Sequence, residues 1–191
     1  MKKVAVAGSL VFLGILFLVG VRVWTQKQPV TPSTVPAKGN ILTSELSITS
    51  PAFANETAIP AVFTCDGENI SPPIAISGVP AGAQSLVLIM DDPDAPDGTF
   101  THWILMDIPP QTRMIAKGTV PEGAVEGVTS FDRPGYRGPC PPSGLHRYFF
   151  TLFALDRKLG FNNQTTRGAL EQAMQGHVLG QTYFYGRYNR R

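Results

Sequence analysis

The sequence predicts a mostly β protein: an antiparallel β-sandwich with one or two short C-terminal helices, preceded by an N-terminal transmembrane helix. Three observations lead to this fold class. The 191-residue chain contains 19 glycines and 17 prolines, a composition that suits many short strands joined by turns. From Leu46 onward, short apolar runs alternate with Pro and Gly clusters, the pattern of a sandwich or barrel. The uncharged stretch Val4–Val21 is long enough to cross a membrane.

Residues 1–24 are predicted to form a signal anchor. Lys2 and Lys3 precede the apolar stretch, which would span about 27 Å as a helix. The stretch runs into Arg22 and Trp24 without an Ala-x-Ala cleavage pattern. The short basic N-terminus should stay in the cytoplasm, which places the rest of the chain on the periplasmic or extracellular side, anchored to the membrane. The alternative is secretion after cleavage of a signal peptide.

Residues 25–44 are rich in Pro and Thr and offer little that could pack, so they are predicted to be a linker. Residues 45–191 are the predicted folded domain. All 14 acidic residues of the chain lie after Asn40, together with 11 of its 16 basic residues. This part therefore carries a net charge of −3 (11 basic, 14 acidic). Because duplex binding needs a basic face, nucleic acid is not an expected partner.

The domain has three clear apolar runs, a helical stretch and a terminal strand. Thr165 or Thr166 can cap the helix, and an apolar face follows it. The predicted elements are strands at Ser85–Met90, His102–Ile108 and Arg147–Leu155, a helix from about Thr165 to Gln175, and a strand near Thr182–Tyr188.

Two histidines stand at strand entrances. Strand alternation places His102 on the face of Ile104 and Met106, and His146 on the face of Tyr148. If the two strands are near neighbours, both imidazoles would line the mouth of one pocket. The alternative is that each histidine is a satisfied structural residue.

Two constrained loops accompany these histidines. Asp91–Gly98 holds four carboxylates, whose mutual repulsion should raise some of their pKa values unless donors or a cation lie nearby. Pro93 and Pro96 fix its backbone, and the bond before Pro96 could be cis. The spacing does not match a calcium loop. In Gly135–His146, glycines expose backbone amides that can hold an anion, and Tyr148 could add a hydroxyl donor.

These motifs resemble those of a known family. The paired signature of the phosphatidylethanolamine-binding family is similar to Asp92-Pro93-Asp94-Ala95-Pro96 with His102-Trp103, and to Gly138-Pro139-Cys140-Pro141-Pro142 with His146-Arg147-Tyr148. Four further motifs resemble those of the bacterial Raf-kinase-inhibitor-like branch: Thr64-Cys65-Asp66-Gly67, Ser71-Pro72-Pro73, Gly176-His177 and Gly186-Arg187-Tyr188. The resemblance runs from about Leu46 to the C-terminus. One departure is Thr129-Ser130-Phe131-Asp132, where bacterial members usually read Asn-Asp-Phe-Gly. The local turn there is in doubt.

The resemblance implies a phosphatidylethanolamine-binding-protein-like β-sandwich with a small anion pocket at one end. The family's pocket residues match Asp92, His102, His146 and Tyr148. The full set of predicted ligand-binding residues is Asp92, Asp94, Pro96, His102, Gly138, His146 and Tyr148. The expected function is non-enzymatic binding of phosphate or a phospholipid head group, with no catalytic residue, metal or cofactor.

Two other functions stay open at this stage. Some family members inhibit kinases or proteases, so this chain could be an inhibitor or scaffold that engages a protein partner through its surface. Two histidines and a carboxylate could instead bind a metal and activate water, as in a metal-dependent hydrolase. Against an enzyme, the sequence contains no Gly-x-Ser-x-Gly elbow and no His-x-x-x-His helix.

Cys65 and Cys140 are the only cysteines, and both lie in Gly/Pro-rich loops of the predicted domain. An even number in an exported protein permits a disulfide. The alternative is two buried free thiols.

Overall fold

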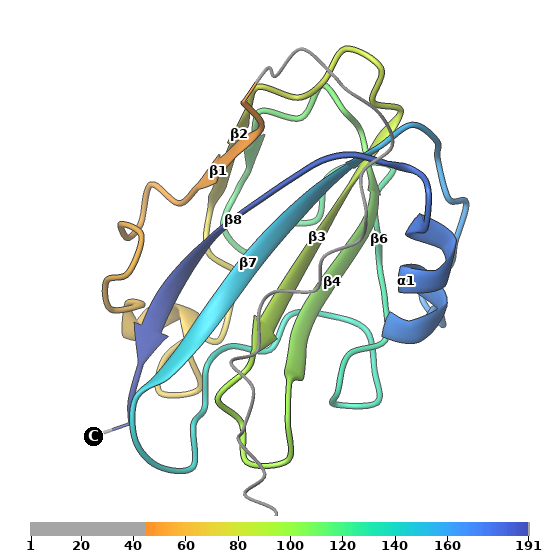
Figure 1. The fold of residues 1–191 in the computed structure, drawn as a ribbon. Helices are drawn as coiled ribbons and strands as arrows, with labels where there is room; N and C mark the ends of the chain where they lie inside the picture. Colours follow the sequence, from red (N-terminus) through yellow and green to blue (C-terminus); the bar gives the residue numbers. More distant parts are fainter. Residues whose placement is uncertain (1–44, 191) are drawn as a thin grey trace, which may run out of the picture.

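The computed structural model describes residues 45–190, which fold into two antiparallel sheets with a helix beside the larger one (Figure 1). The predicted membrane helix (1–24) and linker (25–44) lie outside the described residues. Within residues 45–190, no helix is both long and apolar enough to span a bilayer. The membrane anchor therefore stays a prediction.

Strand pairing divides the elements between two sheets. The three-stranded sheet has the order β1-β2-β5, and the five-stranded sheet has the order β6-β4-β3-β7-β8. The elements are β1 (Ser47–Thr49), the 3-10 helix η1 (Ala61–Phe63), β2 (Ile74–Ser77), β3 (Ser85–Asp92), β4 (Phe100–Ile108), β5 (Met114–Ile115), β6 (Val125–Glu126), β7 (His146–Leu155), α1 (Arg167–Met174) and β8 (Val178–Tyr188).

The core has two layers because the large sheet is covered on both faces. One layer fills the space between the sheets and includes Ile48, Ile74, Trp103 and Phe150. The other lies between the large sheet and α1 and includes Val87, Ile89, Phe153, Leu170 and Met174. Strand β3 runs through the centre, and its apolar residues are all buried. A sheet covered on both faces explains why its strands have apolar runs rather than strict alternation.

The helix is close to its expected position. The hydroxyl of Thr166 accepts a hydrogen bond from the Ala169 amide, so Thr166 caps a helix that ends at Met174. It is the one α-helix in residues 45–190. The last strand is longer than expected and starts at Val178.

A bulge in β4 makes one prediction wrong. Met90 pairs with Trp103 and Asp91 with Thr101, so His102 is an extra residue between them. A bulge shifts the alternation of the residues around it. The His102 ring contacts Tyr148 on the face between the sheets. Ile104 and Met106 pack on the helix face instead, so His102 does not share their face.

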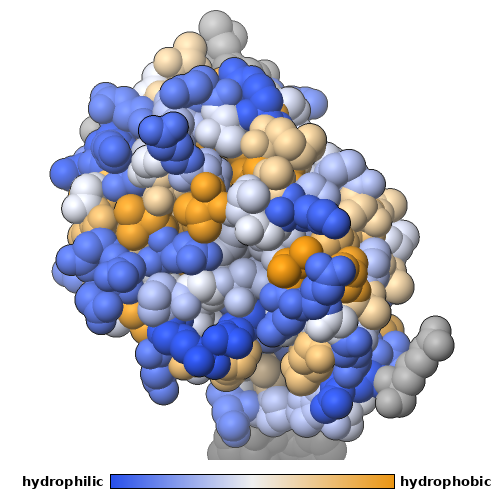
Figure 2. Space-filling model, turned by 180° about the vertical axis from the view of Figure 1, so that it is seen from behind, coloured by the Kyte–Doolittle hydropathy of each residue, from blue (hydrophilic) through white to orange (hydrophobic). Residues whose placement is uncertain are grey.

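Seen from behind, the described residues form a mixed surface. Apolar side chains lie in groups among hydrophilic ones on this face (Figure 2). Apolar groups of this kind are ordinary for a folded surface.

Candidate functional site

The site begins with a buried, hydrogen-bonded Asp–His pair at one end of the sandwich. Asp92 ends β3 and His146 begins β7. The two residues lie 54 positions apart, and the Asp92 Oδ2 to His146 Nδ1 distance is 2.7 Å. The carboxylate can only accept, so Nδ1 of His146 carries the proton and donates it. Nε2 is then the nitrogen that can face a ligand. Asp92 Oδ1 accepts from the Asp94 amide at 2.9 Å, which fixes the carboxylate.

Tyr148 lies beside this pair and has an unusual hydroxyl. Its side chain is fully buried, and its ring stacks on His146 with centroids 6.5 Å apart. Among the described residues, no hydrogen-bond partner reaches its Oη. Burial raises the pKa of this hydroxyl, and the nearby Asp92 carboxylate raises it further through its charge and its hydrogen-bonding effect, so the hydroxyl stays protonated. Buried hydroxyls almost always have a partner, whereas no described residue, Asp92 included, is in hydrogen-bonding geometry with this one.

His102 completes the group from the other side of β3. Strands β4 and β7 do not pair with each other, because β3 lies between them. The bulge nevertheless brings the His102 ring within 5.2 Å of the Tyr148 ring. Nδ1 of His102 donates to the Arg137 carbonyl at 2.8 Å. Burial lowers the pKa of His102, against the opposing effects of this hydrogen bond and of Asp92 and Asp91. A neutral ring of this tautomer leaves Nε2 as an acceptor.

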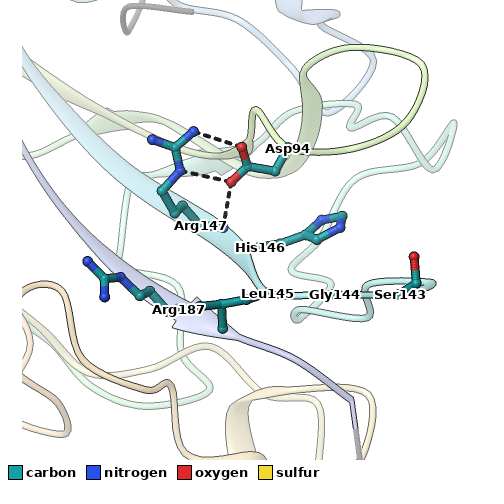
Figure 3. A pocket seen from close by; sticks show the side chains of 7 residues that line it. All are labelled: Asp94, Ser143, Gly144, Leu145, His146, Arg147 and Arg187. Carbon is teal, nitrogen blue, oxygen red and sulfur yellow. Dashed lines mark hydrogen bonds and ion pairs between the residues drawn. The ribbon is translucent and has the colours of Figure 1, made fainter. Parts of the chain in front are cut away.

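A pocket of about 430 Å³ opens next to His146. Figure 3 shows the His146 side chain pointing to one side at the start of β7, and the side chains of Arg147 and Arg187 extending to the other. Asp94 binds Arg147 through three hydrogen bonds, from the backbone amide, Nε and Nη2. These bonds and the Arg147 charge lower the pKa of Asp94. The pocket is lined by Asp94, Ser143, Gly144, Leu145, His146, Arg147 and Arg187.

The loop from Gly135 to Leu145, called the proline loop below, forms the wall of the site. It is held to the segment that includes η1 and the residues after it. Cys140 forms a disulfide with Cys65, with Cα atoms 5.4 Å apart. The hydroxyl of Tyr136 donates to the Phe63 carbonyl at 2.6 Å. The Gly138 amide donates to Asn69 Oδ1 at 2.8 Å. These ties fix the Arg137 carbonyl that orients His102.

Two predicted ligand-binding residues lie apart from the others. Pro96 is exposed in its loop. Of the seven predicted residues, Asp94 and His146 line the pocket, whereas Asp92, His102 and Tyr148 are buried and are not part of its lining. Residues 45–190 contain no cis peptide bond, so the bond before Pro96 is trans. Gly138 is buried, and an added Cβ would clash with the Phe63 carbonyl oxygen. Its visible role is close packing, and its amide is already bound. Ligand binding by either residue stays a prediction.

The loop that departs from the family pattern forms a turn, in which the Asp132 amide donates to the Thr129 carbonyl at 3.0 Å. Asp132 has a φ of 57°, a left-handed conformation that Asp tolerates better than most residues. Phe131 next to it packs its ring 5.4 Å from His102, edge to face. The unusual sequence therefore still covers the site.

Arg187 was not among the predicted site residues, although its motif was recognised. It comes from β8, far from the other motifs in sequence, and pairs across the sheet with Arg147. Strand alternation could have placed Arg147 on the outer face of β7, but only the β7–β8 register brings Arg187 beside it. In the described part of the chain, no group of acidic, His and Cys side chains could hold a metal ion.

Comparison with known proteins identifies the family of the chain. The sequence profile described as phosphatidylethanolamine-binding protein matches residues 49–189. The chain belongs to the phosphatidylethanolamine-binding protein family. Two solved family structures are similar to it. A homologue from Chlamydia trachomatis has a TM-score of 0.75 and 38% identity, covering 78% of this chain and 100% of its own. YbcL from Escherichia coli has a TM-score of 0.72 and 26% identity, covering 77% and 99%.

Several relatives in this family consist of the domain alone. A UPF0098 protein from Methanothermobacter thermautotrophicus is 46% identical over 150 residues, which are 76% of this chain and 99% of the relative. Another, from Aquifex aeolicus, is 49% identical over 152 residues, 76% and 89% of the two chains. The matched region therefore makes up most of the length of these relatives, and it aligns with the whole solved chain of the Chlamydia trachomatis homologue.

Proposed function

We propose that this chain is a binding protein for a small oxyanion, a phosphate or a phospholipid head group, held where Asp92, His102, His146 and Tyr148 meet. The observation that carries the proposal is the buried Tyr148 hydroxyl without a partner. A phosphate oxygen would supply the missing acceptor, and leaving such a donor unpaired costs about 1–3 kcal/mol.

The histidines support the same chemistry. Each has Nδ1 bound to a protein oxygen at 2.7 or 2.8 Å, so each leaves Nε2 for a ligand. Nε2 of neutral His102 can accept a hydrogen bond from a P–OH group. Nε2 of His146 can donate a hydrogen bond to a phosphate oxygen when that ring is protonated. The negative charge of Asp92 would repel a fully deprotonated phosphate. A ligand that also carries a proton or an ammonium group, such as phosphoethanolamine, is therefore favoured.

The proposed activity is binding without a covalent step. The imidazole of His146 is bound to a carboxylate, but the pocket hydroxyl nearest in sequence, Ser143, forms no hydrogen bond with it in the described structure. A nucleophile and its base should lie within hydrogen-bond reach. The proposed activity is therefore binding.

The test is thermal unfolding of residues 41–191, free of metal, titrated with phosphate and with phosphoethanolamine. Ligand that binds only the folded state should raise the free energy of unfolding by about 2.7 kcal/mol at a hundredfold excess over Kd. In Tyr148→Phe, which removes only the hydroxyl, and in His146→Ala, most of this gain should disappear.

His177→Ala is a matched control. His177 Nδ1 also binds a carboxylate, Asp156 Oδ1 at 2.8 Å, but this pair lies beyond the opposite end of β7. The control should respond to ligand like the wild type. A wild-type protein whose unfolding is indifferent to both ligands would refute the proposal.

A further inference from the structure

Two arginines face each other at the mouth of the pocket. Arg147 of β7 and Arg187 of β8 are direct partners in the antiparallel ladder, and both line the pocket. Their side chains extend to the same side, away from the His146 ring (Figure 3). Like charges directly opposite each other on neighbouring strands are destabilising.

The backbone hydrogen bonds show that Arg147 and Arg187 form a non-hydrogen-bonded pair of the antiparallel ladder. The Arg187 amide donates to the Thr57 carbonyl, and the Arg187 carbonyl accepts from the Ile59 amide, both at 2.8 Å. The Arg147 amide donates to Asp94 Oδ2 at 3.0 Å. Neither arginine therefore exchanges backbone hydrogen bonds with the other. In such pairs the facing Cα atoms are about 4.5 Å apart, and the side chains are nearer than in hydrogen-bonded pairs.

Each guanidinium group is also held in place by a ring. The Arg147 Cζ lies 5.7 Å from the Phe149 centroid, and the Arg187 Cζ lies 5.8 Å from the Tyr185 centroid. The two rings are themselves cross-strand partners, stacked with centroids 4.8 Å apart. Stacking on aromatic faces restricts a guanidinium group, so less conformational freedom is lost when it binds an anion.

The two charges are not equally neutralised. Asp94 binds Arg147 at 2.8 Å to Nε and 2.7 Å to Nη2. The carboxylate near Arg187 is Glu56, at 3.6 Å, and both side chains are largely exposed. Among the described residues, the one hydrogen bond from the Arg187 guanidinium group is a long one, from Nη2 to the Tyr185 hydroxyl at 3.4 Å. Arg187 therefore keeps donors and positive charge available at the rim.

We infer that Arg147 and Arg187 form an anion clamp that binds the phosphate group of a phosphate ester at the pocket mouth. The free donors of the two guanidinium groups would reach oxygens of one phosphate, in the geometry that favours arginine over lysine. An anion between the arginines would also remove their mutual repulsion. This inference rests on the proposed function because both concern phosphate binding beside His146. It assigns the phosphate to Arg147 and Arg187, which line the pocket, rather than to the buried group of Asp92, His102 and Tyr148.

The test uses Arg187→Gln in residues 41–191, with phosphate as the probe. A charge-assisted hydrogen bond of this kind corresponds to about a tenfold change in Kd, so the variant should bind phosphate about tenfold more weakly. Without ligand, its free energy of unfolding should equal or exceed that of the wild type, because a like-charge contact has been removed. A merely structural arginine would instead lower it.

Arg190→Gln is the matched control. It removes the same charge three residues further along, where Arg190 Nε lies 3.4 Å from Asp66 Oδ1, outside the pocket lining. Phosphate affinity should be nearly unchanged in this variant. Equal losses in Arg187→Gln and Arg190→Gln would mean a general charge effect and would overturn the clamp.

Comparison with Tyr148→Phe separates the two proposals. Loss of phosphate binding in Tyr148→Phe but not in Arg187→Gln would overturn the clamp and leave the buried site. Loss in Arg187→Gln alone would support the clamp and overturn the buried site. A parallel measurement with phosphatidylethanolamine vesicles distinguishes the phosphate's source. The clamp is supported if Arg187→Gln weakens whichever of the two ligands the wild type binds.

Leu145 motivates the vesicle comparison. It lines the same pocket and is 57% exposed. An exposed leucine beside two arginines suits the boundary between head groups and acyl chains of a bilayer. Binding to vesicles that is lost in Leu145→Ser would identify a lipid as the source, whereas equal phosphate binding in solution by Leu145→Ser would show that the clamp itself is intact.

Discussion

His102 shows how one residue can be fixed in a single chemical form. Its backbone carbonyl accepts from the Arg137 amide at 3.1 Å, and its Nδ1 donates to the Arg137 carbonyl. Its ring lies among Phe100, Phe131 and Tyr148. This apolar surrounding disfavours the charged ring, so the protein holds His102 as a neutral tautomer with one free acceptor nitrogen.

The burial of His102 predicts a pH dependence of stability. The folded-state pKa is lowered from its ordinary value of 6.5, so the unfolded chain binds more protons between the two values. The free energy of unfolding therefore decreases as pH falls below about 6.5. His102→Asn keeps a donor near the Arg137 carbonyl but cannot titrate, and its loss of stability on acidification should be smaller. Thermal unfolding at a series of pH values measures both slopes, and equal slopes would contradict the prediction.

At the scale of elements, Arg167 joins the helix to the sheet behind the site. Its Nη1 donates to both oxygens of Asp91, at 2.7 and 2.8 Å, and its Nε donates to Glu171 at 2.9 Å. Asp91 also accepts from the Thr101 hydroxyl at 2.8 Å. One guanidinium group thus connects α1 to β3 and β4, on the face opposite the Asp92–His146 pair.

Arg167→Ala should destabilise the fold by about 2 kcal/mol. It leaves Asp91, with a side chain only 15% exposed, without its main counter-charge, and breaking a buried pair costs about 3–5 kcal/mol, which partial exposure reduces. Denaturant unfolding measures the change. Arg113→Ala is the control, because Arg113 is exposed and donates only to backbone carbonyls. Its effect should stay within about 0.5 kcal/mol, and an equal effect of both variants would refute the role of Arg167.

At the scale of the whole molecule, the disulfide closes a long loop. Cys65 and Cys140 are 75 residues apart, and the loop between them includes β2 to β6. The bridge holds the proline loop, which carries the wall of the candidate site, against the segment after η1. Disulfides persist in oxidising compartments, which agrees with the predicted export of the domain.

Reduction of this disulfide should lower the free energy of unfolding by about 4 kcal/mol, the chain-entropy value for a loop of this length. Unfolding with and without a reductant measures the difference. The double variant Cys65→Ser/Cys140→Ser should match the reduced protein and should not respond to reductant. A wild-type protein equally stable in both conditions would show that the bridge adds no stability.

The sequence alone determined the features that depend on near neighbours in the chain. Apolar runs located β3, β4 and β7 within two residues at each end, and the two candidate caps Thr165 and Thr166 marked the start of α1, where Thr166 is the cap. The ordered motifs identified the family and named Asp92, His102, His146 and Tyr148, of which Asp92 and His146 form a direct pair. These features could be predicted because periodicity, caps and turn residues act over a few positions.

Only the tertiary structure decided which of these residues meet. His102 faces Tyr148 because a bulge in β4 changes its face, and strand alternation by itself gave the wrong one. Arg147 faces Arg187 because of the β7–β8 register. The Tyr148 hydroxyl has no hydrogen-bond partner within residues 45–190, because the packing of β7 between the sheets buries it away from any acceptor there. A shift of one residue in register would exchange the faces of a strand, and contacts between distant strands set that register.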